Sequence, residues 1–193
     1  MHISEGVLRP EIIIPAWAVT GVAVSVLLYK LKSDEISKVA AFSAIFFVAS
    51  FIHFPLFGVT SVHLILSGLI GIMLGTNAFL AIFVGLFFQG LVFGFGGLSS
   101  LGVNTLIMGF PAIFMKFIAF KISPPKVGFF LAGFLAILIS AFLLALTLFL
   151  NGEELKVLAF AVFAMNIPLA IIEGFITLFA VSFILKIKPG VLK

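Results

Sequence analysis

The chain has 193 residues, of which 63% are hydrophobic and 9% are charged, and its mean hydropathy is +1.41. Soluble domains are about half apolar and about a quarter charged, so this composition excludes a water-soluble globular protein. Cysteine is absent, which excludes disulfides, thiolate metal sites and cysteine nucleophiles. The formal net charge of +4 does not indicate nucleic-acid binding here, because basic residues in so apolar a chain set membrane topology.

Charged and turn-forming residues divide the chain into seven apolar stretches, which we interpret as helices because an open-ended segment in lipid must satisfy its own backbone. The predicted bounds are 11–31, 39–57, 62–74, 78–93, 103–122, 127–150 and 156–187. The third and fourth are shorter than the roughly 20 residues that a span requires. They either cross obliquely or form a re-entrant pair that turns at Gly75-Thr76-Asn77.

These stretches predict an all-α polytopic protein of the cell (inner) membrane, a bundle of about seven transmembrane helices that forms one domain over residues 1–193. In this arrangement nine of the eleven basic residues lie on one side of the membrane, and only Arg9 and Lys156 lie on the other. The nine are Lys30, Lys32, Lys38, Lys116, Lys121, Lys126, Lys186, Lys188 and Lys193. The positive-inside rule therefore predicts a cytoplasmic C-terminus and an N-terminus outside.

Small residues at four-residue spacing predict where helices approach closely. Ser67, Gly71 and Gly75 form one such face, for which internal packing is expected. Ala16 and Thr20 form another on the first span, which we expect to face a partner subunit.

All three histidines, His2, His53 and His63, fall on the outer side of this topology. His2 is distinctive because the α-amine of Met1, the amide nitrogen of residue 2 and the imidazole Nδ1 can all bind one metal ion. The amine and amide close a five-membered chelate ring, and the amide and Nδ1 close a six-membered one. His63 is the predicted fourth ligand, whereas His53 is expected to be structural.

An all-nitrogen, nearly planar ligand set suits Ni²⁺ or Cu²⁺, fits Co²⁺ less tightly and suits Mg²⁺ or Ca²⁺ poorly. No G-x-x-x-x-G-K-[ST] sequence is present, so the chain does not hydrolyse ATP through a P-loop, and no H-E-x-x-H zinc-protease sequence is present.

Glu173 is the only acid deep in a predicted span. A carboxylate at that depth is either functional or a hydrogen-bonded tie between helices. Asn166, Asn104 and Gln89 are its expected partners.

Four separate motifs then resemble one family. They are Met1-His2-Ile3-Ser4-Glu5-Gly6-Val7-Leu8, Ser61-Val62-His63-Leu64, the run from Phe95 to Thr105 (FGGLSSLGVNT), and Ile171-Ile172-Glu173-Gly174. These motifs, in this order, resemble the CbiM/NikM family, and the resemblance extends from Met1 to about Thr177. Members of this family are the substrate-capture components of cobalt and nickel transporters of the energy-coupling-factor type.

The resemblance implies a metal site made by the amine and amide of the first two residues, the imidazole of His2 and a second histidine that matches His63. It also implies an N-terminal segment that enters the bundle from outside, and a loop over Gly94–Gly102 that covers the site. Glu5, Asn104 and Glu173 match motif positions and are expected to support the site or the fold, as is His53. The resemblance also implies a histidine in many relatives where this chain has Asn166, so a further histidine ligand at that position is not expected to be essential here.

The same resemblance implies that the bound metal, Co²⁺ or Ni²⁺, is the substrate and that no organic cofactor is present. The implied partners are a transmembrane coupling subunit, a pair of cytoplasmic ATPase subunits that hydrolyse ATP, and a small accessory membrane subunit. The chain itself is then not an enzyme, and cobalt uptake would serve cobalamin biosynthesis. The alternatives are a vitamin-type substrate-capture component and an intramembrane enzyme. An organic ligand would favour several Trp or Tyr residues, and this chain has one of each.

Overall fold

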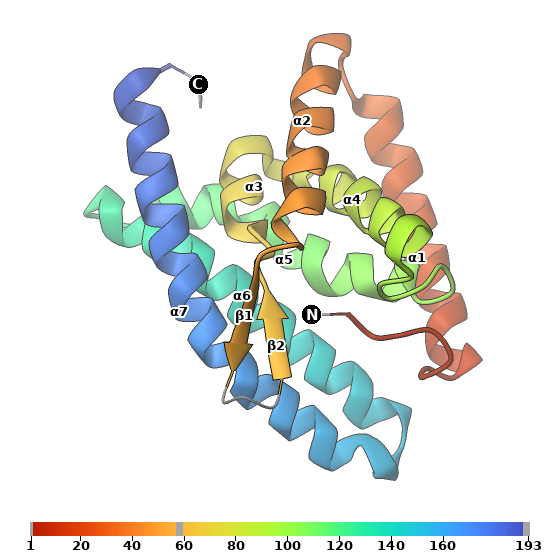
Figure 1. The fold of residues 1–193 in the computed structure, drawn as a ribbon. Helices are drawn as coiled ribbons and strands as arrows, with labels where there is room; N and C mark the ends of the chain where they lie inside the picture. Colours follow the sequence, from red (N-terminus) through yellow and green to blue (C-terminus); the bar gives the residue numbers. More distant parts are fainter. Residues whose placement is uncertain (1, 57–59, 191–193) are drawn as a thin grey trace.

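The computed structural model describes residues 2–56 and 60–190, and over residues 53–62 it describes the backbone only. Within those residues the elements in chain order are α1 (Pro10–Lys30), α2 (Ser33–Ala49), β1 (His53–Leu56), β2 (Thr60–His63), α3 (Ser67–Leu74), α4 (Ala78–Phe93), α5 (Leu101–Lys121), α6 (Pro125–Asn151) and α7 (Lys156–Ile187). Short 3₁₀ turns over Gly75–Asn77 and Glu153–Leu155 precede α4 and α7. The fold is therefore helical, as the sequence predicts, apart from one β-hairpin (Figure 1).

Five segments among the described residues are long and apolar enough to cross a membrane, which makes this a multi-pass membrane protein. They are Pro10–Lys30, Ser67–Phe93, Leu101–Lys121, Pro125–Asn151 and Glu153–Ile187. The predicted turn at Gly75-Thr76-Asn77 is present as a 3₁₀ turn, and Gly75 has φ +58°, a left-handed conformation that favours glycine. The turn lies between α3 and α4 within one 27-residue apolar segment, Ser67–Phe93, where the sequence predicted either two short oblique spans or a re-entrant pair.

The hairpin corrects the predicted helices 39–57 and 62–74. α2 ends at Ala49, and β1 then pairs with β2 antiparallel, with His53 opposite His63 and Phe54 opposite Val62 in backbone register. Pro55 is tolerated there because an edge strand does not need every N–H for pairing. Pairing between β1 and β2 therefore replaces the helix that the apolar run suggested up to residue 57.

Small residues bring the central helices to backbone contact. A Cβ at Gly68 of α3 would overlap the backbone of Gly133 in α6, and a Cβ at Gly71 would overlap the Ala112 carbonyl of α5. This confirms the expected internal packing of the small-residue face of α3. The face of α1 that was expected to meet another subunit is also internal at Thr20, which is buried and donates its hydroxyl to the Gly102 carbonyl of α5 at 2.8 Å.

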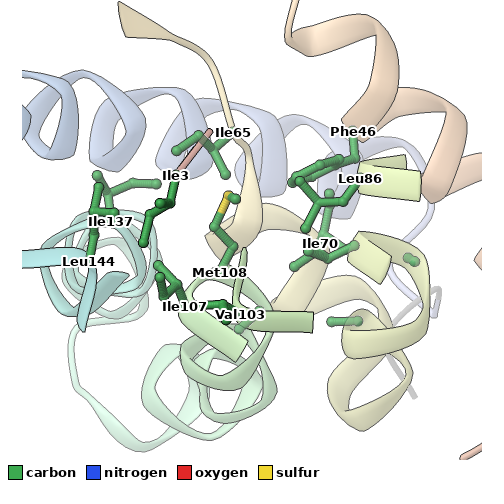
Figure 2. Close-up of a cluster of buried hydrophobic side chains, with 14 of the residues drawn as sticks. Ile3, Phe46, Ile65, Ile70, Leu86, Val103, Ile107, Met108, Ile137 and Leu144 are labelled. Atoms are coloured by element: carbon green, nitrogen blue, oxygen red, sulfur yellow. The ribbon is translucent and has the colours of Figure 1, made fainter. Parts of the chain in front are cut away.

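The N-terminal segment that precedes α1 enters the bundle. Ile3 is 3% exposed and belongs to the same hydrophobic cluster as side chains of α5 and α6. Figure 2 shows Ile3 beside Ile137 and Leu144, with Ile107 close by. Burial of one isoleucine in such a cluster contributes about 2 kcal/mol, so Ile3 anchors the segment that precedes α1 in the core.

Candidate metal site

Asn104, near the start of α5, fixes the N-terminal segment next to His2. Its Oδ1 accepts a hydrogen bond from the Ile3 amide at 3.0 Å, and its Nδ2 donates to the Ile3 carbonyl at 3.1 Å. Ser100 also donates its hydroxyl to that carbonyl, at 2.9 Å. The N–H and the C=O of Ile3, the residue that follows His2, therefore both have hydrogen-bond partners inside the bundle.

His2 and His63 come together although 61 residues separate them in the chain. The two rings stack with their centroids 4.9 Å apart, and His2 Nδ1 lies 3.2 Å from His63 Nε2. His63 is buried, at 8% exposure, and His2 is half-buried. The structure thus places side by side the two imidazoles that the sequence singled out as ligands.

The outer nitrogen of each ring also has a hydrogen-bond partner. His63 Nδ1 lies 2.9 Å from the Leu64 carbonyl, which can only accept, so Nδ1 carries the proton. His2 Nε2 lies 2.8 Å from Gln89 Oε1, and Gln89 Nε2 donates to the Phe46 carbonyl at 3.4 Å, which orients the amide with its oxygen toward His2. The two facing nitrogens, His2 Nδ1 and His63 Nε2, lie within hydrogen-bond distance of each other, and a metal ion would replace the proton between them.

Electrostatics also keep His2 available as a ligand. Burial holds the pKa of His2 well below its usual value of 6.5, and the hydrogen bond to Gln89 opposes this only in part. A neutral imidazole is the form that binds a metal ion. The imidazole of His2 is consequently neutral at neutral pH.

A glycine-rich loop between α4 and α5 lies against His2 and Glu5. Gly96 and Gly97 have φ values of +78° and +74°, and a Cβ at Gly96 would press on Asn104 Nδ2 and on the His2 ring. Glu5 Oε1 accepts a hydrogen bond from the Ser99 amide at 3.3 Å. The loop thus covers the segment that carries His2, as the resemblance implied, and only glycine fits at Gly96.

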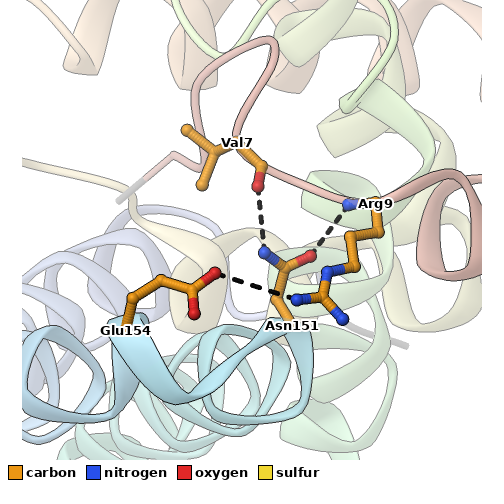
Figure 3. A network of polar contacts seen from close by, with 4 residues as sticks. All are labelled: Val7, Arg9, Asn151 and Glu154. Carbon is orange, nitrogen blue, oxygen red and sulfur yellow. Dashed lines mark hydrogen bonds and ion pairs between the residues drawn. The ribbon is translucent and has the colours of Figure 1, made fainter.

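The other end of the N-terminal segment is attached to α6. Asn151 Oδ1 accepts from the Arg9 amide at 2.8 Å, and Asn151 Nδ2 donates to the Val7 carbonyl at 3.0 Å (Figure 3). Arg9 also lies 3.8 Å from Glu154, an exposed ion pair of the kind that contributes less than about 1 kcal/mol. Two asparagines from different helices therefore hold the segment at Ile3 and at Val7–Arg9.

The remaining predicted site residues divide into three groups. Glu5 and Asn104 adjoin the histidine pair through the contacts above. Met1 lies outside the described residues, and His53 is described only by its backbone position opposite His63. Glu173 is fully buried, but its expected partners were wrong: its carboxylate accepts from the backbone amides of Ile65 and Leu66.

The hydrogen bond between Gln89 and His2 was not predicted from the sequence, which instead suggested Gln89 as a partner of Glu173. A buried glutamine in an apolar helix carries no motif that could have identified its partner. Among the residues that the structure describes, no cluster of three or more His, Asp or Glu side chains is present.

Comparisons with known proteins identify the family to which this chain is similar. The family described as "cobalt uptake substrate-specific transmembrane region", CbiM, matches residues 2–191. A putative metal transport protein of Haemophilus influenzae is 33% identical over all of this chain and 97% of its own length. The cobalt transport protein CbiM of Lachnoclostridium phytofermentans is 34% identical over 92% of this chain and 79% of its own length.

Two further comparisons concern nickel and the fold. A putative fused nickel transport protein, NikMN, of Archaeoglobus fulgidus is 28% identical over all of this chain and 68% of its own length. A crystal structure described as a truncated transition metal transporter superposes with a TM-score of 0.77 at 25% identity, covering 96% of this chain and 99% of that one.

Proposed function

The chain belongs to the CbiM family of cobalt-uptake transmembrane proteins, and we propose that it captures Co²⁺ or Ni²⁺ with high affinity as the substrate-specific component of an energy-coupling-factor transporter. Membership makes it a multi-pass component of cobalt or nickel transport. The ligand set, the affinity and the mode of coupling are the parts that we propose.

The observation that carries the proposal is the approach of two ring nitrogens, His2 Nδ1 and His63 Nε2, to 3.2 Å. Each of them can bind a metal ion in the form that carries no proton on that nitrogen. Nitrogen ligands lie about 2.0 Å from a first-row divalent ion, so two neighbouring ligands in a square arrangement are about 2.8 Å apart. A small inward movement of either ring would therefore suffice for coordination.

We propose that the α-amine of Met1 and the amide nitrogen of His2 complete the set to four nitrogens. The bonds from Asn104 and Ser100 to Ile3 support this, because they hold the backbone that follows the chelating residue. Four nitrogens in a plane favour Ni²⁺ in intrinsic affinity and also accept Co²⁺. Cobalt is the metal in the family's description, and nickel is named for one of the relatives above.

Coupling to ATP hydrolysis is assigned to other subunits. The sequence has no P-loop, so energised uptake requires a cytoplasmic ATPase pair and a transmembrane coupling subunit, with a small accessory membrane subunit. The lysines that cluster at the α1–α2 link, the α5–α6 link and the C-terminal end support a cytoplasmic position for these parts. The histidine pair and the N-terminus then face outside.

The terminal chelate is tested by adding one residue before Met1. This keeps every side chain but converts the amine into an amide, so we expect metal binding to be lost. His2→Ala should abolish binding, His63→Ala should weaken it because three terminal nitrogens remain, and His53→Ala should change it least. The measurement is Ni²⁺ and Co²⁺ stoichiometry and affinity for the purified chain in detergent. Full binding by the extended form would contradict the proposed ligand set.

A further inference from the structure

Glu173 reaches across the bundle from the middle of α7 to the segment that follows His63. It is fully buried, and its Oε1 accepts from the Ile65 amide at 2.5 Å and from the Leu66 amide at 3.0 Å. Its Oε2 lies 3.0 Å from the same Leu66 amide. A side chain 107 residues further along the chain thus caps the start of α3, whose N-cap residue makes no side-chain bond of its own.

The turn that Glu173 holds is one that its own sequence disfavours. Leu66 has φ +59° and is the only non-glycine residue with a positive φ in the described part of the chain. A left-handed conformation is unfavourable for a leucine and persists only where surrounding contacts impose it. The two oxygens of Glu173 on the Leu66 amide are such contacts, so the path from β2 into α3 depends on α7.

The same carboxylate is connected to His63 through a single peptide group. The Leu64 carbonyl, which accepts from His63 Nδ1, and the Ile65 amide, which donates to Glu173, belong to one peptide unit. The contacts therefore run without interruption from carboxylate to peptide N–H, and from peptide carbonyl to imidazole N–H. Hydrogen bonds in such a chain polarise one another, and a partner on the outer nitrogen of a ligating histidine orients the ring and raises the basicity of the other nitrogen.

We propose that Glu173 is the positioning residue for His63 in metal capture. Acting through the Leu64–Ile65 peptide, it sets the orientation of the ring and increases electron density at Nε2, so that α7 controls the affinity of a site to which it contributes no ligand. This proposal rests on the proposed function, since it takes His63 as a ligand.

Two substitutions at Glu173 test the relay. In Glu173→Gln one oxygen can still accept from Ile65, but an NH₂ group then faces the Leu66 amide and the charge is removed. Glu173→Leu removes both acceptors at similar volume. Changes in the outer shell of a metal site typically cost 10- to 100-fold in affinity, so we expect Ni²⁺ and Co²⁺ affinity to fall about 10-fold with glutamine and up to about 100-fold with leucine.

Thr177→Val is the matched control. Thr177 lies one turn further along α7, is fully buried, and its hydroxyl has no hydrogen-bond partner among the described residues. This near-isosteric change should leave metal affinity within about twofold of the unmodified chain, because the Thr177 hydroxyl makes no hydrogen bond among the described residues that could relay a change to His63. A loss as large as that of Glu173→Gln would mean that any change in this part of α7 disturbs the site, and would overturn the proposal.

A double-mutant cycle separates a relay through His63 from a general effect on the fold. In the His63→Ala background the two Glu173 substitutions should change the residual affinity by less than about twofold. Equal losses in both backgrounds would overturn the positioning role while leaving the proposed function intact. If His63→Ala alone binds metal as the unmodified chain does, it is the proposed function that fails.

A readout without metal guards against poor folding of the leucine variant. In chain labelled with ¹⁵N-histidine, Glu173→Gln should shift the His63 Nδ1–H proton resonance upfield, because its hydrogen bond to Leu64 weakens, and should leave His2 unchanged. An unmoved His63 resonance would refute the relay.

Discussion

Replacing Asn104 with alanine should weaken metal binding although Asn104 is not a proposed ligand. The substitution removes the two hydrogen bonds that connect α5 to the Ile3 backbone, at 3.0 and 3.1 Å. Ser100 still satisfies the Ile3 carbonyl, so the Ile3 amide is the group left without its partner. The expected result is partial release of the segment that carries His2.

The size of this effect follows from the hydrogen bonds lost. At about 1 kcal/mol net for each bond, docking of the segment becomes about 2 kcal/mol less favourable. A free-energy change of 1.4 kcal/mol corresponds to a tenfold change in an equilibrium constant, so the apparent dissociation constant of the metal rises by at most about 30-fold. That limit is reached when most of the metal-free chain has the segment undocked. Burial of Ile3 in the core continues to favour docking and reduces the loss below that limit.

Asn151→Ala is the matched control for Asn104→Ala, because it also removes two backbone hydrogen bonds from the same segment. Those bonds hold Val7 and Arg9, well after His2 in the chain. We expect a change below about threefold in Ni²⁺ affinity, measured by titration calorimetry in detergent. Hydrogen exchange of the Ile3 amide should become faster in Asn104→Ala only. Equal losses of affinity in the two variants, or none in Asn104→Ala, would refute the view that the Ile3 clamp positions His2.

Three further outcomes are expected. Gln89→Leu removes the acceptor that keeps the proton on His2 Nε2, so metal affinity should fall about tenfold, and an unchanged affinity would show that Gln89 does not set the tautomer. Because burial lowers the pKa of His2 in the folded chain, the unfolded chain binds more protons below pH 6.5. Stability of the metal-free protein should therefore fall as the pH drops below that value, by at most about 1.4 kcal/mol per unit, and thermal melting of His2→Ala should be less sensitive to pH. Single cysteines at Ser33 and Ser99 in this cysteine-free chain should react with an impermeant thiol reagent on intact cells at position 99 only, and the reverse pattern would invert the proposed topology.

The helices could be predicted from the sequence wherever an apolar run ends at charges or at strong turn residues. Lys30 and Lys32 mark the link between α1 and α2, and Gly75-Thr76-Asn77 marks the turn before α4. The segment 50–66 carries no Asp, Glu, Lys or Arg, and its apolar character led to two helices joined by a short loop at residues 58–61 where the structure has a hairpin. The hairpin there depends on pairing between two strands, which apolar periodicity alone does not reveal.

The candidate site was predictable to the extent that its chemistry lies in motifs. His2 and His63 stand in recognisable sequences, and their chemistry suggested a shared metal before the fold was known. The contacts of Glu173 and Gln89 were not predictable, because their partners are backbone amides of another segment and one ring nitrogen. Such partners have no residue-type signature, and only the packing of α4 and α7 against the segment 63–66 brings them together.

Trp17 offers a way to observe the site optically. It is the only tryptophan in the chain, and its indole nitrogen donates to the Ser99 carbonyl at 2.8 Å, in the loop whose Ser99 amide also bonds to Glu5. Emission excited at the red edge of the indole band therefore comes from one position beside the loop that covers His2. The wavelength and lifetime of that emission report whether the indole keeps its bond, so opening of the loop can be followed in real time without an attached dye.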